Sequence, residues 1–505
     1  MLARLTAARP VILKTEFKVD TRIYYWIGIL LYSITVIGIG FYVWLRDKKQ
    51  GKAQDNTAYW EASRNLSAWS VGLSISASMM SVSWSSVYGV QLFYWYGLGG
   101  SWLLIIPWLL TMGGFFILAP LFRKFQVFSQ PQLLEKRFGT RTRQLLAPTL
   151  ILVFTIWAGA EIYAAGILIA PFLGISLPQT LFLIALIVAI YSYTGGFEAV
   201  VSTDKIQFVL VAVFITAIAF LGLKALPAGA SVWHTPIPPK TQQLPVVFSP
   251  GWVLILLTFI AYMPGWIVET DVWIRLQAAR SDGQARKGIL IAGINSAVFV
   301  GFIPFLIGAS ALILFPPVNG HAPAEIQDGA LIFTVMMQKY APLWLNLALS
   351  IGLIAASMST IDTCGNVVAL SFSHDLMEPV LQKRWPKEKL NLFARLSSVG
   401  AILLAFVYAL FTESLWDIFY LSSGLLTTTV FIPVISSFFK STRKYEVNLS
   451  IIFGFASTIV FYFLESRGML QGIEPQRIAQ TGLGYILWGF LCAVLGFGLG
   501  KIRKK

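Results

Sequence analysis

The sequence is poor in charge and in metal-binding side chains. Only 12% of its 505 residues are charged, whereas a soluble globular domain carries about 25%. The two cysteines lie in apolar segments and the three histidines are scattered, in what we expect to be loops. A disulfide framework or a zinc site is therefore not indicated. No nucleophile–base arrangement or metal-ligand motif appears, so an enzyme is not expected.

Hydrophobic side chains dominate instead. They make up 56% of the chain, and the mean hydropathy is +0.72. Apolar runs recur along the whole length, and each is long enough to cross a hydrocarbon core of about 30 Å. Lipid offers no partner to unpaired backbone groups, so we predict an all-α membrane protein of about thirteen helices. The predicted spans are 23–45, 67–92, 98–122, 146–171, 177–194, 204–226, 251–273, 288–315, 343–372, 393–411, 415–439, 448–465 and 481–500.

The distribution of basic residues explains the net charge of +15 without a nucleic-acid partner. Lysine and arginine concentrate in alternate loops, as the positive-inside rule requires. The rule predicts a multi-pass protein of the cell (inner) membrane with its N-terminus outside and its C-terminus in the cytoplasm. The external tail 1–22 is basic and departs from this pattern. The lipid bilayer is the expected surrounding, and no obligate protein partner is evident.

Two outer loops have distinct character. The stretch 227–250 is rich in proline and is predicted to be an extended loop. The stretch 319–328 is predicted to be a loop as well. Residues 329–341 are amphipathic and are predicted to form a short helix on the outer surface.

Two predicted spans carry signs of interruption. The span 67–92 has seven serines between Ser74 and Ser86, and serine can bond back to backbone carbonyls and loosen a helix. Five spans later, Met263-Pro264-Gly265 interrupts 251–273. Five is an odd number, so the two helices cross the membrane in opposite directions. Such matched breaks are typical of transporters built from inverted repeats, here 67–226 and 251–439, with the extra helix 23–45 before them and the pair 448–500 after them.

Ionisable residues inside predicted spans indicate polar cavities or partners. Glu161 and Asp362 lie deep, whereas Asp204 begins the sixth span beside Lys205 and could be a helix cap or part of an ion pair. Ser359, Asp362 and Thr363 share one helical face. Their hard oxygen atoms suit sodium better than a transition metal. A polar helix–helix interface is the alternative.

Three stretches resemble the sodium:solute symporter family, whose fold is of the leucine-transporter type. Residues 193–207, YTGGFEAVVSTDKIQ, are similar to the family signature Y-x-x-GG-x-x-AV-x-x-TD-x-x-Q, with one residue fewer before the glycine pair. Residues 269–279, ETDVWIRLQAA, resemble the inner end of the seventh span. The triplet 358–360, Met-Ser-Thr, is followed by Asp375-Leu376 as in the family.

The resemblance implies a sodium site between the two repeats. Its ligands are the backbone carbonyls of Ala77, Met80 and Ala356 and the hydroxyls of Ser359 and Thr360. Some members bind a second sodium at positions matching Asp204, Asp362 and Thr363. Asp362 stands here where a hydroxyl is usual, and two carboxylates without a cation would repel each other. We therefore expect this set to hold a second cation or to couple a proton.

The solute pocket departs from two known types in the family. Sugar-binding relatives carry an acidic or amide pair where Ser83-Trp84 stands, and sialic-acid-type relatives carry an arginine in the span that here contains Glu161. Neither substrate is expected. If Glu161 faces the pocket, a cationic or zwitterionic solute is favoured. The candidate pocket residues are Ser78, Met79, Ser81, Trp84, Gln91, Glu161, Trp266 and Glu269.

The expected function is sodium-coupled import of a small organic solute, such as an amino acid, a carboxylate or a vitamin-like molecule, by alternating access. Sodium (Na+) is the expected coupling ion. Proton coupling through Glu161 and Asp362 is the alternative within transport. A membrane sensor or receptor is the alternative from another class, although only residues 501–505 follow the last predicted helix. A channel is disfavoured by the matched broken repeats.

Overall fold

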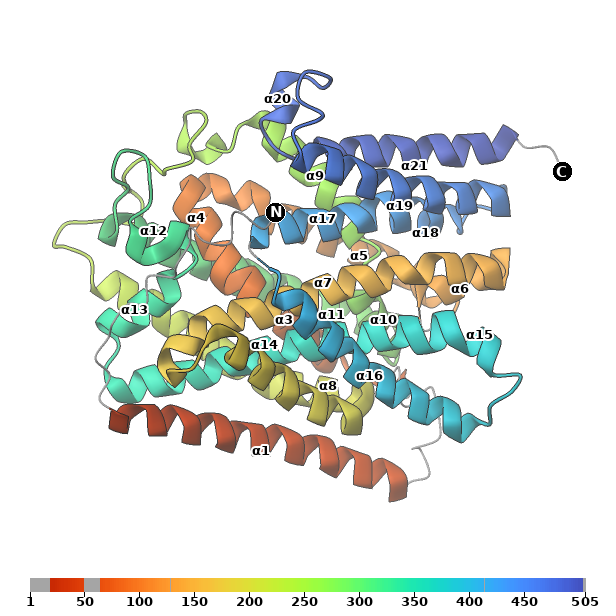
Figure 1. Cartoon of the computed structure of the whole chain (residues 1–505), viewed down its shortest axis with the longest axis horizontal. Coiled ribbons are helices and arrows are strands. Elements are labelled where there is room, and N and C mark those ends of the chain that lie inside the picture. The colour runs from red at the N-terminus through yellow and green to blue at the C-terminus, as the bar shows by residue number, and fades with distance from the viewer. Residues whose placement is uncertain (1–18, 50–63, 128, 413, 503–505) are drawn as a thin grey trace.

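The structure is a computed structural model that describes residues 19–49, 64–127, 129–412 and 414–502. Over these ranges the regular elements are helices, accompanied by isolated bridges such as that between Leu66 and Ala279. The helices run side by side in one bundle (Figure 1). The two ends of the bundle are called outer and inner here, after the predicted orientation. The all-α membrane architecture expected from the sequence is confirmed.

The first half of the chain contains these elements: α1 (Val19–Lys49), α3 (Ala68–Met79), η4 (Val82–Gly89), α4 (Val90–Tyr96), η5 (Gly97–Leu103), α5 (Ile105–Arg123), α6 (Gln130–Phe138), α7 (Thr140–Leu173), α8 (Leu177–Lys224) and η6 (Val246–Phe248). The second half contains α9 (Trp252–Trp266), α10 (Thr270–Ala278), α11 (Asp282–Ser296), η7 (Ala297–Phe302), α12 (Ile303–Leu314), η8 (Ala324–Gly329), α13 (Ile332–Tyr340), α14 (Leu343–Ala369), η9 (Leu370–Met377), α15 (Glu378–Leu381), α16 (Lys387–Ala409), α17 (Leu415–Leu425), η10 (Leu426–Phe431), α18 (Ile432–Ser436), α19 (Lys444–Ser466), α20 (Gln476–Ala479) and α21 (Gly484–Ile502).

Eleven helical segments in the described residues are long and apolar enough to cross a membrane. One of them, Val82–Arg123, contains parts of two predicted spans, and α3 with its 12 residues lies below the required length. The prediction of about thirteen spans therefore differs from this count, chiefly where predicted spans are short, broken or joined.

Helix α8 contains the two predicted spans 177–194 and 204–226. A straight helix of its 48 residues would be about 70 Å long, far more than a bilayer core. Its neighbours show that it doubles back, because Gly174, just before α8, lies against Arg22 near the start of α1, and Gly222 lies against Met336 at the same outer end. Between them, Tyr193 accepts a hydrogen bond from Arg395 through its backbone carbonyl, toward the inner end.

The peripheral helices lie at opposite edges of the bundle. Helix α1 packs on α8 and α14, whereas α19 and α21 pack on each other at the far edge (Figure 1). The last pair is anchored through η10, where a Cβ on Gly454 would lie 2.1 Å from the carbonyl oxygen of Thr428. Only glycine permits this approach. The central helices α3, α7, α9, α14 and α17 therefore carry the polar interior.

Several local predictions are corrected by the structure. His374 is not in a loop: it is buried in η9, beside Glu378. Arg275, which the predicted topology counts among the basic residues of an inner loop, is fully buried within α10. The stretch 319–328, predicted to be a loop, includes most of the short helix η8. The helix predicted at 329–341 is present as α13, but its residues 332–337 are buried rather than on a surface. The tail 1–18 lies outside the described residues.

Candidate sodium and solute site

The first broken helix ends at the serine-rich stretch that predicted it. Helix α3 stops at Met79, and Met80 and Ser81 are not helical before η4 begins at Val82. The Ser81 side chain accepts a hydrogen bond from the backbone N–H of Trp84 at 2.9 Å and so caps the second half. Trp84 would otherwise bind the Met80 carbonyl in a continuous helix. The break thus frees backbone oxygens in the middle of the protein.

Glu161 holds this break open from helix α7. Its two carboxylate oxygens accept hydrogen bonds from the backbone N–H groups of Val82 at 2.7 Å and Ser83 at 2.9 Å. These N–H groups would otherwise bind the carbonyls of Ser78 and Met79. The carboxylate also lies at the positive end of a helix dipole, which favours a negative charge there. Because it accepts from these two N–H groups, Glu161 serves as the N-terminal cap of the second half of the broken helix, and it is fully buried there.

The proposed sodium ligands lie on two segments that meet at the break. Ala77 and Met80 end α3, whereas Ala356, Ser359 and Thr360 belong to α14. The Thr360 hydroxyl donates to the Ser78 carbonyl at 3.1 Å, which joins the two segments. Carbonyl and hydroxyl oxygens are hard donors and fit an alkali-metal ion.

The break in the second broken helix lies four residues later than the sequence predicts, at 267–269 instead of 263–265. Helix α9 continues through Pro264 and Gly265 to Trp266, and α10 begins at Thr270. The hydroxyl of Thr427 on η10 bridges the pair next to the proline, because it accepts from the Gly265 N–H at 2.9 Å and donates to the Ala261 carbonyl at 2.7 Å. These two groups would bond directly in a regular helix. A Cβ on residue 265 would lie 2.8 Å from Thr427, so glycine allows this insertion.

The two broken helices run in opposite directions and are joined through the network of Arg275. The Ser78 hydroxyl donates to Asp271 at 2.9 Å, and Arg275 forms an ion pair with the same aspartate. Arg275 also pairs with Asp204 at 3.1 Å and donates to the Thr363 hydroxyl at 3.0 Å. One buried guanidinium thus supplies positive charge to two carboxylates, as buried ions require.

The residues predicted to form the second cation site, Asp204, Asp362 and Thr363, have different partners in the structure. Asp204 accepts hydrogen bonds from Ser359 at 2.6 Å and from Ser74. Asp362 accepts a hydrogen bond from Ser192 at 2.7 Å instead. Beside Asp204 the guanidinium of Arg275 supplies the positive charge that a second cation was expected to provide. The sequence alone did not indicate this partner, because Arg275 is adjacent to the basic inner loop.

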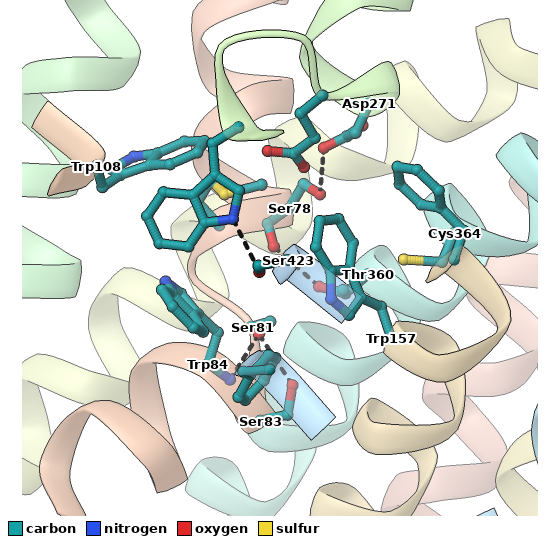
Figure 2. A pocket seen from close by; sticks show the side chains of 15 residues that line it. Ser78, Ser81, Ser83, Trp84, Trp108, Trp157, Asp271, Thr360, Cys364 and Ser423 are labelled. Carbon is teal, nitrogen blue, oxygen red and sulfur yellow. Dashed lines mark hydrogen bonds between the residues drawn. The ribbon is translucent and has the colours of Figure 1, made fainter. Parts of the chain in front are cut away.

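A narrow cavity of about 60 Å³ lies between the two breaks. Figure 2 shows Ser78 turned toward Asp271, with Trp84, Trp108 and Trp157 around the cavity. The cavity is lined by Ser78, Met79, Ser81, Ser83, Trp84, Trp108, Phe154, Trp157, Trp266, Glu269, Asp271, Thr360, Cys364, Phe419 and Ser423.

Six of the eight predicted pocket residues line this cavity: Ser78, Met79, Ser81, Trp84, Trp266 and Glu269. Glu161 and Gln91 are not among its lining residues. The aromatic residues from α5, α7 and α17 were missed, because apolar composition alone does not distinguish a tryptophan that faces a cavity from one that faces lipid. Asp271 was part of a quoted motif but was not assigned to the pocket.

Gln91 belongs to a second, outer vestibule of about 480 Å³. An aromatic layer separates the two spaces, in which Phe419 packs on Trp84 at 4.7 Å and on Tyr88 at 5.1 Å between ring centroids. Asp328 lies at the vestibule, where its carbonyl accepts from Gln91 at 2.8 Å.

Lys240 closes over the same vestibule. It pairs with Asp328 at 3.0 Å and lies 3.1 Å from the ring centroid of Trp95. Burial lowers the pKa of the Lys240 ammonium, although the Asp328 carboxylate opposes this shift. The contact is therefore a weak outer latch, in which desolvation of the amine offsets much of the ion pair.

Comparison with known proteins identifies the family. Residues 59–445, more than half of the chain, match the sodium:solute symporter family. The chain is 26% identical to a sodium/glucose cotransporter of Vibrio parahaemolyticus, over 75% of this chain and 73% of that protein. It is 25% identical to a sodium/sialic acid symporter of Aliivibrio fischeri, over 79% of this chain and 80% of that protein.

A solved structure supports the same fold. The chain superposes on a Na+-coupled sialic acid symporter with a TM-score of 0.70 and 18% sequence identity, over 95% of this chain and 98% of that one. These relatives are transporters rather than enzymes, and sodium is the coupling ion. With its helical membrane fold and broken central helices, the chain belongs to the sodium:solute symporter family.

Proposed function

We propose that this symporter imports a small organic solute, which binds in the central cavity while sodium binds at the break of α3. The observation that carries the proposal is the wall that the two places share. Ser78, Met79 and Thr360 line the cavity, and the same short segments carry the predicted sodium ligands. A solute in the cavity therefore contacts the elements that a sodium ion would fix.

Coupling follows from this shared wall. A sodium ion bound to the carbonyls of Ala77 and Met80 would order the end of α3, including Ser78. The Ser78 hydroxyl reaches Asp271 at the start of α10, so the second broken helix would be ordered as well. If sodium raises the affinity for the solute, the solute must raise the affinity for sodium by the same factor.

Alternating access then requires motion between the two predicted repeats, 67–226 and 251–439. With the N-terminus outside and the C-terminus in the cytoplasm, sodium enters down its concentration gradient and down the membrane potential. Each sodium ion that crosses releases about 2.3 kcal/mol per 100 mV. The aromatic layer around Phe419 would be the thin outer gate, and the Arg275 network would close the inner side.

Uptake into liposomes tests this proposal. The purified chain is reconstituted, and pools of radiolabelled amino acids, carboxylates, vitamins and sugars are offered with an inward gradient of sodium or of protons. We expect uptake that needs sodium and is lost in Ser359→Ala and Thr360→Ala. Uptake driven by protons alone would contradict the sodium site and transfer the coupling role to buried carboxylates such as Asp362.

A further inference from the structure

Glu269 is the buried acid of the cavity that has no partner. Its side chain is 2% exposed and lines the cavity. Its carboxylate accepts no hydrogen bond from any residue that the structure describes, and Arg275 is the one charge that acts on it. A buried ion normally has a paired charge or several hydrogen bonds. The Glu269 carboxylate therefore has only the more distant charge of Arg275, with no ion pair or hydrogen bond of its own in the described residues, and it lies where a solute would bind.

Its neighbour Asp271 shows the contrast. Asp271 also lines the cavity but is paired with Arg275 and bonded to Ser78. Arg275 is shared with Asp204 as well. One guanidinium thus serves two carboxylates before Glu269 is considered, and no lysine, arginine or histidine lines the cavity in the described chain. The cavity therefore holds more carboxyl groups than cationic side chains.

The rest of the lining is aromatic. Trp266 packs edge-to-face against Trp84 at 5.3 Å and against Trp108 at 5.6 Å between ring centroids. The indole N–H groups of Trp108 and Trp266 are engaged by Ser296 and Ser423, at 3.1 Å in both cases. The rings therefore offer π surface rather than hydrogen bonds. Aromatic faces attract organic cations, and cages of this kind recognise alkylated ammonium groups.

We propose that the cavity binds the ammonium group of the solute, with Glu269 as its counter-ion and the surrounding tryptophans as its cage. The inference rests on the proposed function and narrows its solute class. The cavity differs from a dedicated metal cage, because four tryptophans, Trp84, Trp108, Trp157 and Trp266, line it together with its oxygen-bearing side chains. A free carboxylate would find no cation there.

The volume sets the size of the group. One water needs only about 10–15 Å³ of space for its centre, so the cavity of about 60 Å³ has room for several waters or for a compact head group. A primary or a methylated ammonium fits this description. It could belong to an organic cation or to a zwitterion, whose carboxylate would lie outside the cage.

Binding of defined probes tests the proposal. Quenching of tryptophan fluorescence is measured on the full-length protein, with and without sodium, for tetramethylammonium, choline, glycine betaine and the neutral isostere 3,3-dimethylbutan-1-ol. The measurements are repeated on Glu269→Gln, on Glu269→Asp, which keeps the charge, and on Glu446→Gln. Glu446 is a buried acid at the inner start of α19, away from the cavity, and is the matched control.

We expect at least one ammonium probe to bind in a sodium-dependent manner and to outcompete the neutral isostere. Glu269→Gln should weaken it by about tenfold or more, as expected when a charged partner is lost. Glu269→Asp should retain part of the affinity, and Glu446→Gln should retain all of it. A response to choline alone indicates a cationic solute, and a response to glycine betaine indicates a zwitterion.

Two other results would overturn the inference. The first is that no ammonium probe binds. The second is that the neutral isostere binds as tightly as choline, that Glu269→Gln changes neither affinity, and that binding still depends on sodium. The proposed symport would then stand, but with a solute of another class. Sodium-independent binding of every probe would instead contradict the proposed function itself. A sodium-dependent shift of the unfolding temperature in Glu269→Gln shows that this variant is folded.

Discussion

We predict that the cap formed by Glu161 affects the affinity for sodium, although Glu161 is not among the proposed sodium ligands. In Glu161→Gln the side chain keeps its size but retains one acceptor oxygen, and its NH₂ group faces a backbone N–H. The loss is about 1.5–3 kcal/mol for one charge-assisted hydrogen bond, with about 1–3 kcal/mol more for the N–H left without a partner. The total is about 3 kcal/mol.

This energy shifts the equilibrium between the broken and the continuous form of the helix toward the continuous form. Without the cap, the N–H groups of Val82 and Ser83 can return to the carbonyls of Ser78 and Met79, which closes the break and withdraws the oxygens that sodium needs. Each 1.4 kcal/mol is a factor of ten, so we expect the dissociation constant for sodium to rise by up to about 100-fold.

The assay is the sodium-dependent rise in unfolding temperature, since a ligand stabilises the folded protein according to its concentration relative to its dissociation constant. The matched control is Glu465→Gln. Glu465 caps α21 in the same way, accepting from Gly484 at 3.2 Å and Tyr485 at 2.7 Å, far from the cavity. The Glu465→Gln variant should have a lower unfolding temperature but the same affinity for sodium. If both variants lose stability equally and bind sodium as the unchanged protein does, the cap has no part in ion binding.

Three further outcomes are expected. Thr360→Val keeps the shape of the side chain but removes the hydroxyl, and should lower sodium affinity by about tenfold, whereas Thr360→Ser should retain it; equal affinities in flux assays would argue against a hydroxyl ligand. Arg275→Met leaves Asp204 and Asp271 buried without a cation and should lower the free energy of unfolding by about 3–5 kcal/mol, seen as a fall in unfolding temperature. A variant as stable as the unchanged protein would mean that these two acids are neutral. Lys240→Met opens the latch to Asp328 and should increase labelling of a cysteine introduced in the vestibule, while unchanged labelling would show that the latch does not gate access.

The sequence predicted the place of the first break well, because the serines that cap and loosen the helix are local. The second break was predicted at residues 263–265 and lies at 267–269. The difference comes from Thr427, which is far away in sequence and inserts between the Gly265 N–H and the Ala261 carbonyl. The proline marks a weak point in the helix, but the sequence does not show which distant hydroxyl supports the helix there.

The residues of the candidate site were likewise predicted where the signal is local in sequence and missed where it depends on packing. Residues on the broken helices were predicted to line the cavity because polar groups in a membrane helix are unusual. Trp108 was missed because no ionisable group marks its face of α5. Trp157 precedes Glu161 by one turn on α7, so the i, i+4 spacing was a signal that the sequence offered and that was not used. The partner of Asp204 was missed as well, because Arg275 stands at the border of a basic loop and only packing shows that it is buried.

The two walls of the cavity have consequences for how such a protein can change its substrate. The wall of Ser78 and Thr360 lies on the segments that carry the proposed sodium ligands, so we expect a substitution there to alter selectivity and coupling together. The opposite wall, formed by Trp108, Trp157 and Ser423, lines the same cavity but carries no predicted sodium ligand. Substitutions on that wall can therefore change which solute binds while the proposed sodium site keeps its ligands. Solute selectivity and sodium coupling would then depend on different walls of the same cavity.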